Sequence, residues 1–213
     1  QFPDTKWKIN NLGKGWVLGE SLITGIGQGY TQTTPIQLCL MTAQIANGGY
    51  KIIPKILTDD NQLTSEQLVK AIQDSKLNDL YEPLFIDKKN INIVQEAMFS
   101  STNEPSGTSY RSRIDDPKYR FAGKTGTAQV KRISKREREL DLKTFQIPYE
   151  ERDHALYVAF GPYINPRYAL SIIVEHGGSG SKAAAPMAKE LFKLIIDQHQ
   201  IRKKSPDFKE FNT

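Results

Sequence analysis

The sequence predicts an α+β protein in which an antiparallel sheet packs against helices. Two observations predict this class. Helix signals occur in the first half of the chain, and three strand-like segments then follow one another. Strands that are neighbours in sequence commonly pair antiparallel, and their separation from the helices in sequence is typical of α+β folds. A last helical segment, ending near His199, completes the pattern.

Residues 1–24 are predicted to form loops and short extended pieces, with Trp7 and Trp16 as anchors. Residues 25–29, Gly-Ile-Gly-Gln-Gly, come next. Glycines at alternate positions let the backbone turn tightly or approach another segment closely.

Residues 35–46 give the clearest helix signal. Thr34 offers a capping hydroxyl group, and Pro35 fits the first helical position. Residues 47–49, Asn-Gly-Gly, supply a left-handed end. Apolar residues recur near helical spacing in between, so this helix is expected to be largely buried.

Several segments with weaker signals follow this helix. Residues 50–57 are expected to be extended, and a short helix is predicted at residues 65–72. A longer helix is predicted at about residues 90–100, followed by a turn at residues 104–107, Glu-Pro-Ser-Gly. The apolar face of the longer helix comprises Ile91, Val94 and Met98.

β-Formers concentrate in three later segments: residues 119–130, 154–161 and 167–176. Asn165-Pro166 joins the last two in a tight connection, so they are predicted to form a hairpin. A flexible glycine-rich turn is expected at residues 177–181, before the terminal helix. We assign residues 1–199 to part of one domain and residues 200–213 to a polar tail. The apolar face of the terminal helix is expected to comprise Met187, Leu191, Leu194 and Ile195.

Composition argues against several functional classes. The net charge is +5, and the densest basic stretch, residues 131–143, also holds acidic residues and no aromatic residue, so nucleic acid is not an expected partner. A single cysteine, Cys39, is interpreted as a buried small hydrophobic residue, and three scattered histidines predict neither a metal site nor a cofactor. No apolar run approaches the ~20 residues of a membrane span. The start resembles the interior of a longer protein, so any export signal or anchor is expected upstream of Gln1.

The motif Lys124-Thr125-Gly126-Thr127 lies on the first predicted strand. Strand alternation places Lys124 and Gly126 on one face and the two threonines on the other. Two adjacent hydroxyl groups can bind one ligand, while Lys124 supplies positive charge from the opposite face. At a sheet edge, the free N–H groups of such a strand can bind an extended peptide or polarise a carbonyl group.

Four blocks together resemble the class B penicillin-binding proteins. Lys-Thr-Gly is a signature shared by serine β-lactamases and penicillin-binding proteins. Residues 121–130 resemble the third active-site strand of the family, and residues 25–38 resemble its Gly-Gln-Gly segment and following helix. Residues 162–186 resemble the final hairpin and last helix, and residues 7–20 add a fourth block. The blocks occur in family order over most of residues 1–199, and they are most similar to the elongation-type penicillin-binding protein 2 group.

The resemblance implies a β-lactamase/transpeptidase-like fold and a peptidoglycan D,D-transpeptidase that acts through a serine acyl-enzyme. Carried over by position, Lys124 supports proton transfer around an active-site serine, and the N–H group of Thr127 is an oxyanion-hole donor. Thr125, Gly126 and Thr127 form the substrate-binding strand, with the two hydroxyl groups on the carboxylate of the substrate or of a β-lactam.

The resemblance also implies partners and a location. The partners are the D-Ala-D-Ala stem peptide, β-lactam antibiotics, a glycosyltransferase and membrane proteins of the elongation complex. The location is the periplasmic side of the bacterial inner membrane, with the N-terminal anchor outside this chain.

One part of the family pattern is missing from this sequence. No Ser-x-x-Lys motif for the nucleophile precedes Lys124 in it, where the family order would place one. Ser101-Thr102-Asn103 matches the second family motif as a string, but it follows the Gly-Gln-Gly block instead of preceding it. A helix end rich in Ser and Asn is the simpler interpretation. Both motifs are therefore expected upstream of Gln1, and this chain alone is predicted to be inactive.

Two other functional classes remain open. One is a serine β-lactamase or β-lactam sensor of the same superfamily, and the other is a non-catalytic interaction module. His154 and His176 are interpreted as strand-end packing residues. In the family, further strands pair beside the last strand, so residues 167–176 are expected to expose an apolar edge in this chain, which would make it marginally stable or self-associating.

Overall fold

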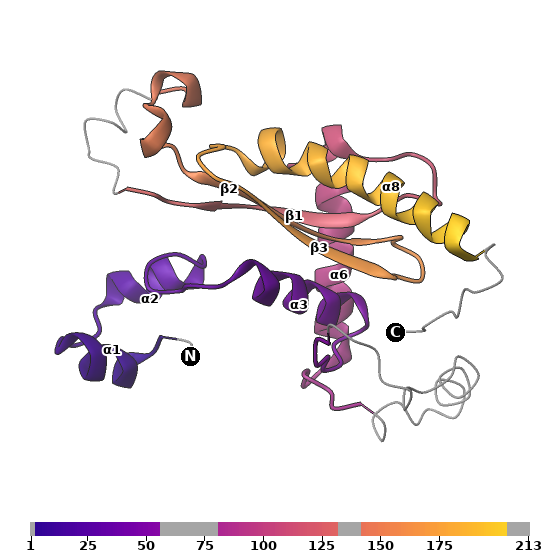
Figure 1. The fold of residues 1–213 in the computed structure, drawn as a ribbon. Helices are drawn as coiled ribbons and strands as arrows, with labels where there is room; N and C mark the ends of the chain where they lie inside the picture. Colours follow the sequence, from indigo (N-terminus) through magenta and orange to yellow (C-terminus); the bar gives the residue numbers. More distant parts are fainter. Residues whose placement is uncertain (1–2, 56–80, 132–141, 204–213) are drawn as a thin grey trace.

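A computed structural model describes residues 3–55, 81–131 and 142–203. In these residues, three strands form one antiparallel sheet in the order β1-β2-β3 (Figure 1). The α+β class and the hairpin between the last two strands are confirmed, and β1 and β3 are the two edges of the sheet. The strands are β1 (Ala122–Ala128), β2 (His154–Gly161) and β3 (Tyr168–Val174).

Helix α8 (Ala185–Lys203) crosses one face of the sheet, and a π-helical turn, Gly180–Ala184, precedes it (Figure 1). The predicted apolar face of this helix is wrong. Met187, Leu191 and Leu194 are exposed, whereas the stripe that packs on the sheet comprises Ala185, Ala188, Phe192 and Ile196. The helix has two apolar stripes, and its alanines let the backbone approach the sheet closely. The helix also continues beyond His199.

Helices α3 (Pro35–Ala46) and α6 (Lys88–Asn103) pack on the opposite face. Thr34 caps α3 as predicted, because its side chain accepts a hydrogen bond from the Gln37 N–H group. The expectation that α3 is largely buried is wrong: Ile36 is 62% exposed, and Thr42 is the one residue of the helix that is buried. The covered side contacts β3, and Ile45 and Ala46 near its end pack against the core around Met98.

Helix α6 is longer than predicted at both ends. It begins after Asp87, whose side chain accepts a hydrogen bond from the Lys89 N–H group, and it ends at Asn103. Met98 of the predicted apolar face is buried in the core, whereas Val94 is 40% exposed. The turn predicted at residues 104–107 is confirmed by the hydrogen bond from the Gly107 N–H group to the Glu104 carbonyl oxygen, at 2.8 Å.

The prediction of loops in residues 1–24 is wrong, because two helices, α1 (Thr5–Leu12) and α2 (Leu18–Gly25), form there. Asp4 caps α1, and Gly13 ends it in the left-handed conformation. The buried Lys8 ammonium group pairs with the Glu20 carboxylate and so joins the two helices. The Asp4 side chain supports the start of α1, and the Glu20 carboxylate supports the start of α2 by accepting a hydrogen bond from the Val17 N–H group.

The remaining predictions concern connecting segments. Residues 50–55 form no regular strand beyond a single bridge between Tyr50 and Pro83. The short helix predicted at residues 65–72, most of the basic segment and the last ten residues lie outside the described part of the chain. Among the described helices, none combines the length and apolar character needed to cross a bilayer.

Candidate active site

The Lys-Thr-Gly motif lies on β1, at an edge of the sheet. Thr125 pairs with Tyr157, whose side chain packs in the core under α8, and Lys124 pairs with Val158, which packs toward α6. Directly paired residues share a face of an antiparallel sheet. The predicted alternation is therefore confirmed for the strand positions: Thr125 and Thr127 are on the face toward α8, and the side chain of Lys124 leaves the strand on the opposite face.

Alternate carbonyl groups along β1 accept hydrogen bonds from side chains outside β2. In an antiparallel pair only every second residue exchanges hydrogen bonds with the partner strand, so the carbonyl groups of the residues between them point toward the free edge. The N–H groups of Thr125 and Thr127 point to the same edge, which no described strand covers. The pairs are Asn103 Nδ2 to Phe121 O at 2.9 Å, Thr102 Oγ1 to Gly123 O at 3.4 Å, Lys124 Nζ to Thr125 O at 2.9 Å, and Gln28 Nε2 to Thr127 O at 2.6 Å.

The Lys124 ammonium group lies at this edge rather than on the face opposite the threonines. Its Nζ atom is 2.9 Å from the Thr125 carbonyl oxygen and 3.3 Å from the Thr125 hydroxyl oxygen. The expectation of charge from the opposite face is therefore wrong, because a free edge offers the long lysine side chain a backbone acceptor. No carboxylate pairs with Lys124 in the described ranges, which leaves its charge available to an anion.

Two further hydroxyl groups extend the polar edge. Thr108 Oγ1 is 3.4 Å from Thr125 Oγ1 and 3.2 Å from Ser101 Oγ. The Thr127 hydroxyl group has no hydrogen-bond partner among the residues that the structure describes. The edge thus presents hydroxyl groups, backbone N–H groups and one ammonium group together, an arrangement suited to a carboxylate and a polarised carbonyl.

The glycine-rich turn before α8 forms one wall of the site. A Cβ atom at Gly180 would lie 2.9 Å from the Gly126 carbonyl oxygen and 3.2 Å from Thr125 Cβ, so only glycine allows this approach. The Gly178 N–H group donates to the Asp153 carbonyl oxygen at 2.8 Å, and Gly180 begins the π-helical turn, so both ends of this turn are tied to neighbouring elements.

The segment Ser101-Thr102-Asn103 ends helix α6 and supports β1. Asn103 Nδ2 donates to the carbonyl oxygens of Phe99 and Phe121. The hydroxyl groups of Thr102 and Ser109 lie 2.9 and 3.0 Å from the hydroxyl group of Tyr157, and burial raises the pKa of Tyr157. These contacts agree with the interpretation of the segment as a helix end.

The two strand-end histidines lie together. The N–H group of His176 donates to Nδ1 of His154 at 2.9 Å, and the His176 ring contacts the Arg152 carbonyl oxygen at 3.1 Å. His176 has a φ of 54°, directly after β3. Their contacts fit the packing role expected for them. Within the described ranges, no three His, Cys, Asp or Glu side chains gather to hold a metal ion.

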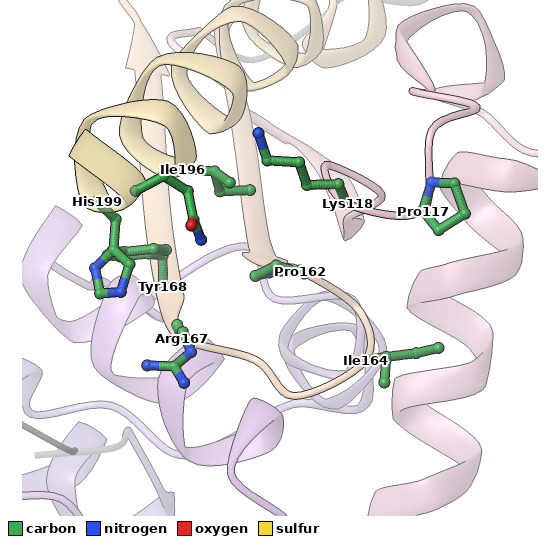
Figure 2. Close-up of a pocket in the computed structure, with 9 residues that line it drawn as sticks. Pro117, Lys118, Pro162, Ile164, Arg167, Tyr168, Ile196 and His199 are labelled. Atoms are coloured by element: carbon green, nitrogen blue, oxygen red, sulfur yellow. The ribbon is translucent and has the colours of Figure 1, made fainter. Parts of the chain in front are cut away.

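A hollow lies beside the connection between β2 and β3 and the C-terminal part of α8 (Figure 2). It is lined by residues that include Lys118, Pro162 and Arg167. Pro162 follows the end of β2 that pairs with Ala122, whereas Thr127 pairs with Ala155 at the opposite end. The hollow therefore lies away from the two threonines of the motif.

Sequence reasoning did not place Gln28 in the site, although it identified the glycine pattern around it. Gly27 and Gly29 have φ values of 74° and 75°, which only glycine adopts readily. Gln28 could have been identified as a candidate because it is a polar residue between two such glycines. Thr102 and Asn103 were noted only as part of a motif string at a helix end, and Thr108 carried no signal, because the roles of all three depend on where α6 ends relative to β1.

Comparison with known proteins agrees with this geometry. The penicillin binding protein transpeptidase domain model matches residues 2–193. The peptidoglycan D,D-transpeptidase MrdA of Haemophilus influenzae is 32% identical over 203 residues, which cover 92% of this chain and 29% of that protein. MrdA of Acinetobacter baumannii is 34% identical, with 96% of this chain and 28% of that protein covered. The chain thus spans less than a third of the length of these relatives.

Solved structures show the same similarity. Pseudomonas aeruginosa PBP2, in complex with WCK 5153, matches with a TM-score of 0.65 and 34% identity over 92% of this chain and 37% of that chain. The complex of Helicobacter pylori PBP2 with MreC matches with a TM-score of 0.64 and 30% identity over 93% of this chain and 31% of that chain. The β-lactamase/transpeptidase-like fold expected from the motifs is confirmed.

Proposed function

The chain belongs to the penicillin-binding protein transpeptidase family, as its motifs predicted, and we propose that the complete protein is a peptidoglycan D,D-transpeptidase that works through a serine acyl-enzyme. The observation that carries this proposal is the free edge of β1. Two threonine hydroxyl groups, two backbone N–H groups and the Lys124 ammonium group meet there.

The reaction divides into two acyl transfers. The serine hydroxyl oxygen attacks the carbonyl carbon of the penultimate D-Ala, the peptide bond to the terminal D-Ala breaks, and the serine proton passes to the leaving amine. An amine from a neighbouring stem peptide then attacks the ester, forms the cross-linking amide and returns the proton to the serine. A β-lactam can replace the peptide in the first step. The serine attacks the lactam carbonyl carbon, the ring amide bond breaks, and the product stays attached to the serine.

Residues of β1 have distinct roles in this scheme. The hydroxyl groups of Thr125 and Thr127 bind the terminal carboxylate, and the nearby Lys124 charge strengthens that binding. The N–H group of Thr127 points out of the edge toward the carbonyl oxygen that becomes negative during attack. In a serine protease, removing one such donor raises the barrier by about 3 kcal/mol.

The nucleophile of the proposed reaction lies outside this chain. No Ser-x-x-Lys motif precedes Lys124 in the sequence, and the string Ser179-Gly180-Ser181-Lys182 follows the Lys-Thr-Gly strand instead. The chain alone is therefore expected to form no acyl-enzyme. The solved complex of the Helicobacter pylori relative with MreC supports a partner of the elongation complex for the whole protein. We place that protein on the periplasmic side of the inner membrane, with a stem peptide as substrate and a glycosyltransferase as a further partner.

Covalent labelling tests the proposal. The complete protein is incubated with a fluorescent penicillin and its intact mass is measured over time. A stable adduct of one antibiotic per protein, mapped to a serine outside this chain, is the expected result. Rapid turnover of the antibiotic without a stable adduct would assign a β-lactamase instead. No covalent product at all would assign a non-catalytic module.

A further inference from the structure

The structure assigns to Gln28 the role of a positioning residue for the active-site strand, an inference that rests on the proposed transpeptidase function. Gln28 Nε2 donates a hydrogen bond of 2.6 Å to the carbonyl oxygen of Thr127, across 99 residues of sequence. Thr127 is the residue whose N–H group is proposed to polarise the reacting carbonyl. The contact therefore holds the backbone of the residue whose N–H group is proposed to take part in the reaction.

The backbone around Gln28 is built to aim its side chain. The N–H group of Gln28 donates to the Ile23 carbonyl oxygen at 3.0 Å, which folds the loop back onto the end of α2. Gly27 and Gly29 take positive φ values on either side. A Cβ atom at Gly29 would lie 2.9 Å from Ile23 Cγ2, so this position excludes larger residues by space as well as by conformation.

The loop is also held from its N-terminal side. The Lys8 ammonium group bonds both the Glu20 carboxylate and the Gly15 carbonyl oxygen, which fixes α2 on α1. Beyond the loop, the ring of Tyr30 packs on the ring of Trp7, with 5.5 Å between centroids. Gln28 thus lies between two anchored points, and its carboxamide is presented to β1 from a supported loop.

Thr127 needs such support more than the residues before it. Asn103 and Thr102, from the end of α6, hold the carbonyl groups of Phe121 and Gly123. Thr127 lies near the end of β1, beyond the reach of α6, and its outward carbonyl group is held by Gln28. Fixing that carbonyl group limits rotation of the Thr127 backbone, and with it the direction of the N–H group of the same residue.

The same contact makes the edge selective for acceptor groups. The Thr125 carbonyl oxygen is engaged by Lys124 and the Thr127 carbonyl oxygen by Gln28, while their N–H groups stay open. A ligand that presents a carboxylate and a carbonyl oxygen meets donors there. This arrangement matches the acceptor-rich end of a D-Ala-D-Ala peptide.

Acylation kinetics of the complete protein test this role. The variants are Gln28→Ala, Gln28→Glu, which keeps the shape without an N–H donor, and Gln28→Lys, which keeps a donor. Gln32→Ala, at an exposed position in the same loop region, is the control. Rapid-mixing experiments with a fluorescent penicillin separate noncovalent binding from the first-order acylation rate, and the melting temperature is measured in parallel.

We expect the acylation rate to fall about threefold to tenfold in Gln28→Ala and Gln28→Glu, because one neutral hydrogen bond is lost. Noncovalent binding and the melting temperature are expected to stay near those of the wild type. Gln28→Lys is expected to recover most of the rate, and Gln32→Ala to match the wild type.

Three results would overturn the assignment. Unchanged acylation in Gln28→Ala and Gln28→Glu contradicts it, and so does a Gln28→Lys variant no faster than Gln28→Ala. A rate loss that simply follows a drop in melting temperature indicates a structural role instead. A wild type that takes no label refutes the proposed function together with this inference, whereas a labelled wild type with unimpaired variants refutes the inference only.

Discussion

The phenol group of Tyr157 occupies the space that a side chain at position 123 would need. A Cβ atom on Gly123 would lie 2.6 Å from Tyr157 Cζ and closer still to the hydroxyl oxygen. That hydroxyl group is fixed by Thr102 and Ser109, and the Tyr157 side chain is fully buried. The glycine before Lys124 therefore lets the active-site strand lie directly on the core.

The substitution Gly123→Ala is expected to lower the free energy of unfolding by about 1–3 kcal/mol, because the added methyl group forces the buried ring to move. Gly19→Ala in α2 is the matched control, since no atom lies within 4 Å of its built Cβ position. Alanine favours a helix over glycine, so the control should be neutral or slightly stabilising. Urea unfolding of the complete protein measures both. Equal stabilities for the two variants would show that Tyr157 yields without cost.

Helix α3 and the hairpin could be predicted, because residues within or next to each segment indicate it. The glycine-rich end and Thr34 cap defined α3, and β-formers with a tight Asn165-Pro166 turn defined the hairpin. Helices α1 and α2 were missed, because the ion pair between Lys8 and Glu20 joins residues twelve apart and α2 is too short for its apolar residues, Leu18 and Leu22, to set a clear period. The choice between the two apolar stripes of α8 could not be predicted, because the stripe that is buried depends on how the helix fits the sheet.

The candidate site could likewise be predicted only in part. Lys124, Thr125 and Thr127 could be placed on one strand from the motif, and alternation gave their faces. The position of the Lys124 ammonium group could not be predicted, because it depends on an acceptor that only a free edge supplies. The contact from Gln28 spans 99 residues, and no local pattern encodes its partner.

Removing the threonine hydroxyl groups is expected to slow acylation of the complete protein. Thr125→Val and Thr127→Val each delete one hydrogen bond to a charged carboxylate, a loss of about 1.5–3 kcal/mol, or roughly tenfold to hundredfold in rate. Thr33→Val, at an exposed position just before the N-cap of α3, is the control. Labelling with a fluorescent penicillin measures the rates. Wild-type rates in both variants would remove these hydroxyl groups from carboxylate binding.

The ion pair between α1 and α2 predicts a specific dependence of stability on pH. The hydrogen bond from Lys8 lowers the pKa of Glu20 below its ordinary value of 4.5. A carboxyl group whose folded pKa is lowered stabilises the fold above the unfolded pKa, and this contribution is lost as pH falls through the folded value. Between pH of about 6 and about 3, the wild type should therefore lose more stability than Glu20→Gln. The melting temperatures of the wild type and of Glu20→Gln are measured across this pH range. Equal losses in the two proteins would contradict this account of the pair.

The free edge of β3 predicts self-association of the 213-residue chain when it is produced by itself. β3 lies at the edge of the sheet opposite β1, and Ile173 on it is 37% exposed. Ile173→Lys should reduce association, because charge on an exposed edge blocks strand pairing. Leu194→Lys, on the exposed side of α8, is the control that should not. Sedimentation velocity decides the question, and a wild-type chain that stays monomeric with a sharp cooperative melt would refute the prediction.

The most direct test of the central claim is a crystal structure of the complete protein acylated by a penicillin. The account predicts the antibiotic carboxylate within hydrogen-bonding distance of the Thr125 and Thr127 hydroxyl groups. It also predicts the acyl carbonyl oxygen about 3 Å from the Thr127 backbone nitrogen. An acyl group bound away from β1, or a further strand paired along the outer edge of β1, would contradict it.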